Sequence, residues 1–216
     1  MMSSLNSAER LCLELAWQAF GAGSVPVGAV VLNQTGEVVA TGRSRMYEPS
    51  APPPELANSL LAHAEVNALV ALDPHLRYED HTLVTALEPC PLCLGALAMS
   101  TVGRLVYLGA DPYGGAVGLL SDTPHTARVP VQVVGPRDDA VGLLVSALHV
   151  ACYLRRNPDG AVVRVHRDLR PDLISIAHNL LAASAMSGRG RDRRTGTSTA
   201  ATVASGCDGV GTTAAW

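Results

Sequence analysis

The 216-residue chain contains no lysine, and all 16 of its basic residues are arginine. Without lysine, the chain can form neither a Schiff base on an amine side chain nor a lysine-bearing phosphate loop. Long hydrophobic runs are also missing, although 48% of the residues are hydrophobic. Stretches such as VPVGAVVL at 25–32 are far shorter than the roughly 18 apolar residues of a membrane span. The N-terminus has no basic leader before an apolar core, unlike a signal peptide. These absences predict a cytoplasmic protein without a membrane segment.

Cysteine is scarce, and its five positions, 12, 90, 93, 152 and 207, are scattered along the chain. An odd number without regular spacing does not form a disulfide framework. The cysteine content therefore predicts a reducing compartment, which agrees with a cytoplasmic location.

Charge is distributed unevenly. Residues 1–158 hold 9 Arg against 14 Asp and Glu, a net charge of −5, whereas residues 159–216 hold 7 Arg against 5 Asp, a net charge of +2. Binding of a polyphosphate depends on basic side chains that neutralise its phosphates. The acidic main part of the chain therefore disfavours tRNA as a partner without excluding it.

The hydrophobic pattern predicts alternating helices and strands. Helices are expected at 7–20, 60–72, 89–100, 138–156 and 171–186, and strands at 26–33, 37–45, 81–87, 104–110 and 129–135. Ser7 is the expected N-cap of the first helix, without a complete capping box because Arg10 stands three residues on. The proline-rich SAPPPEL at 50–56 is expected to be a loop, and 158–168 a hairpin or loop. This order predicts an α/β domain with helices packed on one central sheet.

Two short motifs carry the candidate chemistry. His63-Ala64-Glu65 and Cys90-Pro91-Leu92-Cys93 each lie near the start of an expected helix. The two cysteines, at i and i+3, share one face of the first helical turn, where the helix N-terminus favours both thiolates. With the neutral imidazole of His63 they suit a tetrahedral zinc whose fourth position is left for water. Glu65 is placed to act on that water as general base and acid.

Two other interpretations of the cysteine pair stay open from the residues alone. One is a redox-active CxxC pair. The other is a structural zinc site, which would need a fourth protein ligand; Cys12, Cys152 and His81 are the candidates, and Glu65 would then have no task. Cys12 and Cys152 lie among apolar helix residues and are otherwise expected to be buried thiols.

Other polar residues receive structural interpretations. Arg155 and Arg156 end a helix whose dipole they complement. Tyr113 either lines the pocket and stacks on a base or lies in an exposed turn. Six histidines show no ligand spacing and are expected to be exposed or satisfied by neighbours: His75, His81, His125, His149, His166 and His178.

The motif pair resembles the H-x-E…P-C-x-x-C signature of the zinc-dependent cytidine/deoxycytidylate deaminase superfamily. Within it the chain is most similar to the branch of bacterial guanine deaminases and tRNA-specific adenosine deaminases, because VPVGAVVLNQTGEVVATG and RLVYLGADPYGGAVG also resemble that branch. The similarity extends from about residue 9 to 156. It implies a three-layer α-β-α fold with a central mixed sheet of about five strands and helices on both faces, a homodimer and hydrolytic deamination. It also implies that the backbone at Ala64 and Cys90 orients the base.

The chain departs from that branch at two places near the site. Ser44 stands where the branch usually has an asparagine that contacts the base, and a serine makes fewer hydrogen bonds than an amide. A longer segment, SAPPPELANSLLA at 50–62, replaces the usual lead into His63 and is expected to reshape one wall of the pocket.

The resemblance divides the chain into a catalytic domain at 1–157, an extension at 158–187 and a tail at 188–216. The extension contains the helix at 171–186, which could close over the active site as a lid. The tail is rich in Gly, Ser, Thr and Arg with almost no large apolar residue, a composition that cannot order itself.

The preferred hypothesis is a zinc hydrolase that deaminates a small aminated base or nucleoside and releases ammonia. In this hypothesis His63, Cys90 and Cys93 bind the zinc. Glu65 transfers protons. The expected substrate contacts are Ser44, Ala64 and Tyr113. The alternative is a tRNA-specific adenosine-to-inosine deaminase, against which stand the acidic charge, Ser44 and the altered loop. A third hypothesis is a non-catalytic deaminase-fold subunit, which would have no need of Glu65.

Overall fold

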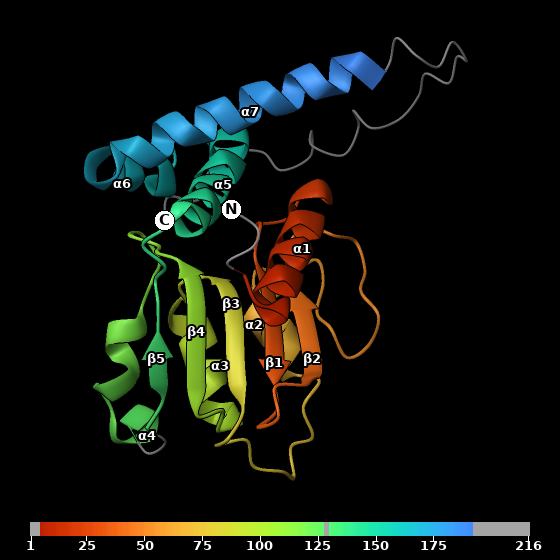
Figure 1. The fold of residues 1–216 in the computed structure, drawn as a ribbon, viewed down its shortest axis with the longest axis vertical. Coiled ribbons are helices and arrows are strands. Elements are labelled where there is room, and N and C mark those ends of the chain that lie inside the picture. The colour runs from red at the N-terminus through yellow and green to blue at the C-terminus, as the bar shows by residue number, and fades with distance from the viewer. Residues whose placement is uncertain (1–4, 128–129, 192–216) are drawn as a thin grey trace. The chain divides into compact units, whose positions relative to one another are not determined.

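The protein is built around one mixed five-stranded sheet (Figure 1). The computed structural model describes residues 5–127 and 130–191. The strands are β1 Gly28–Leu32, β2 Val38–Arg43, β3 Thr82–Leu87, β4 Arg104–Gly109 and β5 Gln132–Val134. Their order is β2-β1-β3-β4-β5. β1 pairs antiparallel with β2 and β3, whereas the β3–β4 and β4–β5 pairs are parallel. The predicted mixed sheet of about five strands is confirmed.

Helices cover both faces of this sheet. They are α1 Ser7–Gly21, α2 Ala64–Leu69, α3 Pro91–Ser100, α4 Pro124–Ala127, α5 Ala140–Arg156, α6 Ala161–Leu169 and α7 Pro171–Arg191, with a 3-10 turn η2 at Val117–Ser121. α1 and α5 lie on one face, and α2 and α3 lie on the other (Figure 1). The three-layer α-β-α arrangement is therefore confirmed.

The cap of α1 differs from the expectation. Asn6, and not Ser7, is the N-cap residue. Its Oδ1 accepts a hydrogen bond from the backbone N–H of Glu9 at 2.9 Å, and Glu9 Oε2 accepts from the backbone N–H of Asn6 at 2.9 Å. This reciprocal pair is a complete capping box. With Ser7 as the expected N-cap, the third helical position was Arg10 instead of Glu9, so the capping box was not recognised in the sequence.

A glycine in β2 allows α2 to pack directly on the sheet. A Cβ added at Gly42 would lie 2.4 Å from the carbonyl oxygen of Ala64 and 2.4 Å from the backbone N of Ala68. Contacts this short with backbone atoms cannot be relieved by a change of rotamer. The missing side chain at Gly42 therefore sets the position of the helix start that bears the His63-Ala64-Glu65 motif.

The segment after Asn157 forms two helices, which corrects the expected hairpin or loop at 158–168. α6 buries Val162, Val163 and His166, at the i, i+1 and i+4 positions of one helical face. A second apolar cluster joins α5 to the start of α7 and contains Ala147, Val150, Ala151, Leu173 and Ala177.

The chain divides into two compact units, Met1–Leu181 and Ala182–Trp216. Residues 158–181 lie in the same unit as the sheet, and the domain boundaries expected at 157 and 187 stay predictions. The expected tail at 188–216 lies outside the described residues from 192 onward, while 188–191 belong to α7. No helix in the described ranges is long and apolar enough to cross a membrane.

Candidate active site

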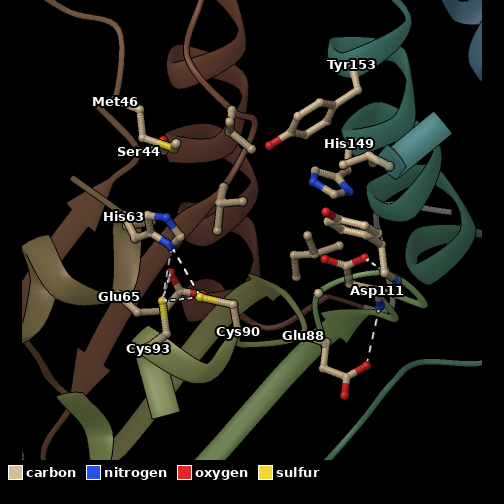
Figure 2. Close-up of a pocket in the computed structure, with 17 residues that line it drawn as sticks. Ser44, Met46, His63, Glu65, Glu88, Cys90, Cys93, Asp111, His149 and Tyr153 are labelled. Carbon is tan, nitrogen blue, oxygen red and sulfur yellow. Dashed lines mark hydrogen bonds between the residues drawn. The ribbon is translucent and has the colours of Figure 1, made fainter. Parts of the chain in front are cut away.

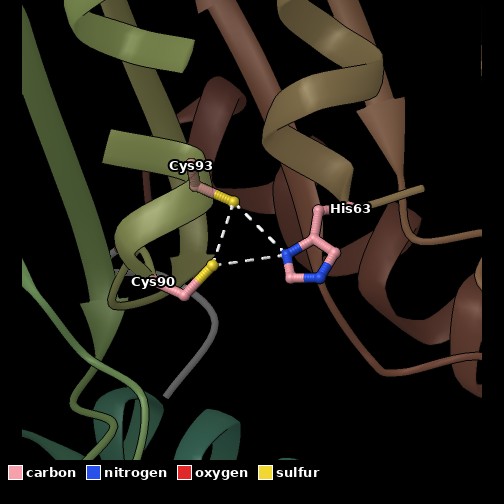
Figure 3. A group of neighbouring side chains, drawn as sticks. All are labelled: His63, Cys90 and Cys93. Atoms are coloured by element: carbon pink, nitrogen blue, oxygen red, sulfur yellow. Dashed lines mark hydrogen bonds between the residues drawn. The ribbon is translucent and has the colours of Figure 1, made fainter. Parts of the chain in front are cut away.

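The two sequence motifs meet at the first turns of α2 and α3 (Figure 3). His63 is the N-cap residue of α2, and Cys90 is the N-cap residue of α3, where Pro91 takes the first helical position. Neither N-cap side chain makes a capping hydrogen bond. Both side chains therefore turn toward the gap between the helices. The helix expected from residue 60 begins only at Ala64, and this late start makes His63 a cap residue.

The three candidate metal ligands form a compact triangle (Figure 3). Nδ1 of His63 lies 3.5 Å from Sγ of Cys90 and 3.4 Å from Sγ of Cys93, and the two Sγ atoms are 3.7 Å apart. Tetrahedral zinc bonds to sulfur at about 2.3 Å and to nitrogen at about 2.05 Å, which places two sulfurs about 3.8 Å apart and sulfur about 3.6 Å from nitrogen. The donor set and all three separations therefore fit a tetrahedral zinc ion with its fourth position open.

Glu65 is held beside this triangle (Figure 2). Its side chain is buried, with 3% of the residue exposed. Oε1 accepts a hydrogen bond from the Thr85 hydroxyl of β3 at 2.9 Å, and Oε2 accepts one from the Cys93 thiol at 3.3 Å. The carboxylate is thus fixed by two contacts next to the position that the triangle leaves open.

The protonation of the four side chains is strongly coupled. The hydrogen bond between the thiols lowers the pKa of Cys90 to about 4, against the effect of its burial, and raises the pKa of Cys93. The hydrogen bond with Cys90 also raises the pKa of His63. Burial raises the pKa of Glu65, while the charge of His63 acts in the opposite sense. The expected lowering of the pKa therefore holds for Cys90 and not for Cys93, whose pKa is raised by the hydrogen bond with Cys90 and by burial.

The geometry bears on the interpretation of the cysteine pair as part of a structural zinc site. The group of mutually close ligand atoms contains His63, Cys90 and Cys93 and no fourth His, Cys, Asp or Glu from the described part of the chain. Cys12 is buried and its thiol contacts the carbonyl oxygen of Gly28 at 3.0 Å. Cys152 is likewise buried in α5. A site with three protein ligands and an adjacent carboxylate has the composition of a catalytic zinc site rather than a closed structural one.

The triangle opens into a pocket of about 190 Å³ (Figure 2). The expected substrate contacts Ser44, Ala64 and Tyr113 all line it. Ser44 is 2% exposed, and its hydroxyl has no hydrogen-bond partner among the described residues. Tyr113 lines the pocket and is 47% exposed, and its stacking on a base stays a prediction. A buried hydroxyl without a partner needs one from a ligand or water, which agrees with Ser44 as a substrate contact.

Several lining residues were not found from the sequence. They are Met46, Glu88, Asp111, His149, Tyr153 and Val162. They come from five separate segments, and of these residues only Glu88, two positions before Cys90, lies close in sequence to one of the two motifs. None of the residues that line the pocket belongs to the described segment 50–62, so the expected effect of this segment on a pocket wall is not observed. Asn67 instead ties this segment to α2, since its side chain bonds both the N–H and the carbonyl oxygen of Leu56 at 2.8 and 3.1 Å.

The pocket is acidic. Its lining contains the carboxylates Glu65, Glu88 and Asp111 and, among the described residues, no arginine. Glu88 holds the loop after β4, because its two carboxylate oxygens face the backbone N–H groups of Asp111 and Val117 at 3.4 and 3.5 Å. The carboxylates of this lining disfavour the entry of a phosphate group.

Replacing Thr85 with valine is expected to lower kcat for deamination about 10- to 100-fold, because a hydrogen bond to a charged group contributes about 1.5–3 kcal/mol. Valine keeps the shape of threonine but leaves Glu65 Oε1 without the 2.9 Å contact. Steady-state kinetics would show the fall in kcat with KM little changed and the bound zinc retained. Thr85→Ser restores the hydroxyl and is expected to restore most of the activity. Equal losses in both variants would contradict a positioning role for the hydroxyl.

Comparisons with known proteins find a zinc-binding family and deaminase relatives. The profile of the family described as the cytidine and deoxycytidylate deaminase zinc-binding region matches residues 2–109, half of the chain. A tRNA-specific adenosine deaminase of Bacillus subtilis is 34% identical over 132 residues, which cover 58% of this chain and 76% of that protein. A solved chain from studies of A-to-I editing by tRNA:A34 deaminases is 30% identical with a TM-score of 0.50, and the match covers 59% of this chain and 95% of that one. The X-ray structure of guanine deaminase from Bacillus subtilis is 27% identical with a TM-score of 0.42, covering 50% of this chain and 66% of that one.

The chain therefore belongs to the cytidine and deoxycytidylate deaminase family, and it carries the zinc-binding region of that family. The resemblance inferred from the two motifs is confirmed. The chain is also 42% identical over 123 residues to the tRNA(Ile)-lysidine synthase of Deinococcus radiodurans, a match that covers 55% of this chain. It spans only 19% of that protein and 26% of the corresponding protein of Deinococcus deserti.

Proposed function

We propose that the protein is a zinc-dependent hydrolase that converts an amino group on a small nucleobase or nucleoside to a carbonyl and releases ammonia. The observation that carries this proposal is the buried carboxylate of Glu65, fixed by Thr85 beside the triangle of His63, Cys90 and Cys93. A guanine-type, cytosine-type or related aminated ring presents an amino-bearing carbon next to a ring nitrogen, which is the arrangement this chemistry requires.

The residues of the pocket have separate roles in the proposed deamination. His63, Cys90 and Cys93 hold the zinc, which when bound acts as a Lewis acid that activates water for attack. Glu65 accepts a proton from the attacking water, delivers it to the ring nitrogen and assists transfer to the departing amino group. The oxygen of water thus replaces the amino nitrogen, and one ammonia is formed for each water consumed. Ser44 and the backbone at Ala64 orient the ring from the pocket wall.

Two observations support a small, uncharged substrate. The pocket lining combines three carboxylates with no described arginine, so it has no partner for a phosphate. The arginines at the end of α5 are engaged within the molecule, because the guanidinium of Arg155 lies 4.2 Å from the ring centre of Phe20 and that of Arg156 lies 3.4 Å from the ring centre of Tyr47. Cation–π contacts of this kind anchor α5 and leave these arginines less available to RNA.

The second candidate is tRNA-specific adenosine deamination, favoured by one observation. The relatives at 34% identity and the solved chain at a TM-score of 0.50 are tRNA adenosine deaminases. A third candidate, a non-catalytic subunit, is opposed by Glu65, whose buried position and two side-chain contacts have no use in a binding module.

Ammonia release by the purified zinc-loaded protein separates these candidates. The panel contains free bases, nucleosides, nucleotides and a tRNA anticodon stem-loop, and the Glu65→Ala variant serves as the blank. We expect turnover of a free base or nucleoside and none of the corresponding nucleotide. Turnover of the stem-loop alone would replace the proposal with the tRNA candidate. Absence of turnover throughout, with zinc bound, would favour the non-catalytic subunit.

We also propose that the protein is a cytoplasmic homodimer. Val70, Leu76 and Met99 are 41%, 60% and 66% exposed and line one apolar groove formed by α2, α3 and the loop after α2. A groove of this kind is a candidate contact between two copies. Sedimentation analysis is expected to give the mass of two chains, and Met99→Asp the mass of one. Leu169→Asp, at an equally exposed leucine of α6, is the control and should leave the mass at two chains. A wild-type mass of one chain would contradict the proposal.

A further inference from the structure

The pocket has a second polar cluster outside the proposed catalytic group (Figure 2). Asp111 follows β4, His149 lies on α5, and His166 lies on α6. They are 8%, 5% and 0% exposed, and their nearest nitrogen and oxygen atoms all lie within 4.8 Å of one another. Asp111 and His149 line the pocket, and His166 lies behind them. In Figure 2 Asp111 and His149 reach the pocket from the side opposite His63.

The hydrogen bonds of this cluster are incomplete. His166 Nδ1 lies 2.8 Å from the carbonyl oxygen of Val162, which only accepts, so Nδ1 carries the hydrogen and Nε2 of the neutral ring is an acceptor. Nε2 faces Asp111 Oδ1 at 4.0 Å and has no hydrogen-bond partner among the described residues. Nδ1 of His149 also lacks one. From the described part of the chain, Asp111 Oδ1 accepts a hydrogen bond only from the backbone N–H of Tyr113, at 3.0 Å. Two acceptors that face each other across a gap need a hydrogen-bond donor or a cation between them.

The separations distinguish a donor from a metal ion. Tetrahedral zinc, with bonds of about 2.1 Å to nitrogen and oxygen, would hold two such ligand atoms about 3.4 Å apart. The 4.0 Å between His166 and Asp111 exceeds this value, whereas the triangle of His63, Cys90 and Cys93 matches its own tetrahedral separations. A donor atom at about 2.8 Å from each acceptor would hold the acceptors about 4.6 Å apart. The 4.0 Å separation is therefore too long for a tetrahedral zinc and leaves room for a shared hydrogen-bond donor.

Charge excludes an anionic ligand. Asp111 is buried, and within the described residues the only basic side chain with a nitrogen within 4.0 Å of its carboxylate is that of His166. A phosphate at this position would face the carboxylate without an arginine to neutralise it. The ligand group must therefore carry no negative charge and must donate hydrogen bonds.

We propose that Asp111 and His149, supported from behind by His166, form a second recognition site that binds a hydrogen-bond-donating group of the substrate. This inference rests on the proposed function, because it places the reacting carbon of the ring at Glu65 and the donor group at the far side of the same pocket. The donor is either a sugar hydroxyl, in which case the substrate is a nucleoside, or a ring N–H or amino group of a free base. Carboxylates bind both kinds of donor, and ribose hydroxyls are among their common partners.

A cycle of paired substitutions tests the site. The protein variant is Asp111→Asn, and the ligand variants are guanosine, adenosine and cytidine, their 2′- and 3′-deoxy forms and the free bases. Binding is measured by calorimetry in a zinc-loaded Glu65→Ala background, so that the result does not depend on turnover. We expect Asp111→Asn to weaken binding of one ligand about 10- to 100-fold, and to have less than about a 2-fold effect on the analogue that lacks the bound donor. If the effect of Asp111→Asn disappears when a sugar hydroxyl is removed from the ligand, the substrate is a nucleoside. If it depends on a ring N–H or amino group, the substrate is a free base.

Stability provides an independent readout. The side-chain oxygen kept in Asp111→Asn can still accept the Tyr113 N–H, and the substitution removes a buried charge, so the melting temperature of the variant should not fall. The matched control is Asp80→Asn, at an exposed aspartate that also pairs with a histidine, His81, but does not line this pocket. This variant should change neither the affinity for any ligand nor the difference in affinity between a ligand and its analogue. His149→Gln is the second test variant and should show the same ligand dependence.

Three results would overturn the proposal. The first is an equal loss of binding for all ligands, which would indicate a structural role for the cluster. The second is unchanged binding in both Asp111→Asn and His149→Gln. The third is a second zinc ion per wild-type chain that disappears in Asp111→Asn, which would make the cluster a metal site. A failure of the proposed deamination would appear separately, as an absence of ammonia release by a wild-type protein that still shows coupled binding.

Discussion

Replacing Glu65 with alanine is expected to lower the rate of deamination about 10²- to 10⁴-fold while the protein keeps its zinc. The physical reason is that Glu65 is the one general acid–base group fixed beside the open position of the metal site, and proton transfer by such a group contributes a factor of this size. Ammonia release gives the rate, and metal analysis of the same sample gives the zinc content. Glu65→Gln keeps the volume of the side chain and its acceptor oxygen toward Thr85, and it is expected to lose activity to a similar extent.

The control for this prediction is Glu14→Ala, at an exposed carboxylate of α1, which should retain wild-type activity. A Glu65→Gln variant with full activity would show that proton transfer does not pass through this carboxylate. A Glu65→Ala variant that loses its zinc would show instead that Glu65 is needed to form the metal site. The two variants together therefore separate proton transfer from metal binding.

Replacing Cys90 with alanine is expected to remove zinc from the protein and to lower activity more than about 10³-fold. Two ligands remain in this variant, and the tetrahedral set of His63, Cys90 and Cys93 is broken. The melting temperature should fall as well, because a ligand present at about 1,000 times its Kd stabilises the folded state by about 4 kcal/mol. Metal analysis, activity and thermal unfolding of the same preparation check the three parts of this prediction.

Chelation of the wild-type protein should reproduce these losses, and added zinc should reverse them. Cys152→Ser is the matched control, since this buried thiol of α5 lies outside the ligand triangle. It should keep one zinc per chain and its activity. If Cys90→Ala kept its zinc, the ligand assignment would be wrong. If it lost zinc but kept activity, the metal would have a structural task only.

The parts of the structure that were predicted correctly depend on short-range patterns. A proline before the first helical position, a cysteine pair at i and i+3 and a His-x-Glu triplet each describe a single helical turn. Five strands were likewise visible as short apolar runs, because strands covered by helices on both faces are apolar along their length. The errors of local structure were small in extent. The cap of α1 was expected at Ser7 and is Asn6, α2 was expected to begin before Ala64, and α6 was expected to be a hairpin or loop.

The second polar cluster shows where sequence patterns stop being informative. Asp111, His149 and His166 are separated by 38 and 17 residues, as their numbers show, and no fixed spacing relates them. The expectation that His149 and His166 are exposed or satisfied by neighbours is wrong, because both are buried and each has a ring nitrogen without a hydrogen-bond partner among the described residues. Only the packing of α5 and α6 over the end of β4 brings them together.

The sequence by itself determined the family, the zinc-ligand set and the candidate proton-transfer residue, because each depends on residues within one or two helical turns, where the geometry follows from spacing. The tertiary structure alone decided that Thr85 holds Glu65, that the Cys93 thiol contacts Glu65, and that the pocket is acidic with a second polar end. These features depend on contacts between distant segments and on burial. Both arise from how the helices pack on the sheet, and no spacing along the chain encodes them.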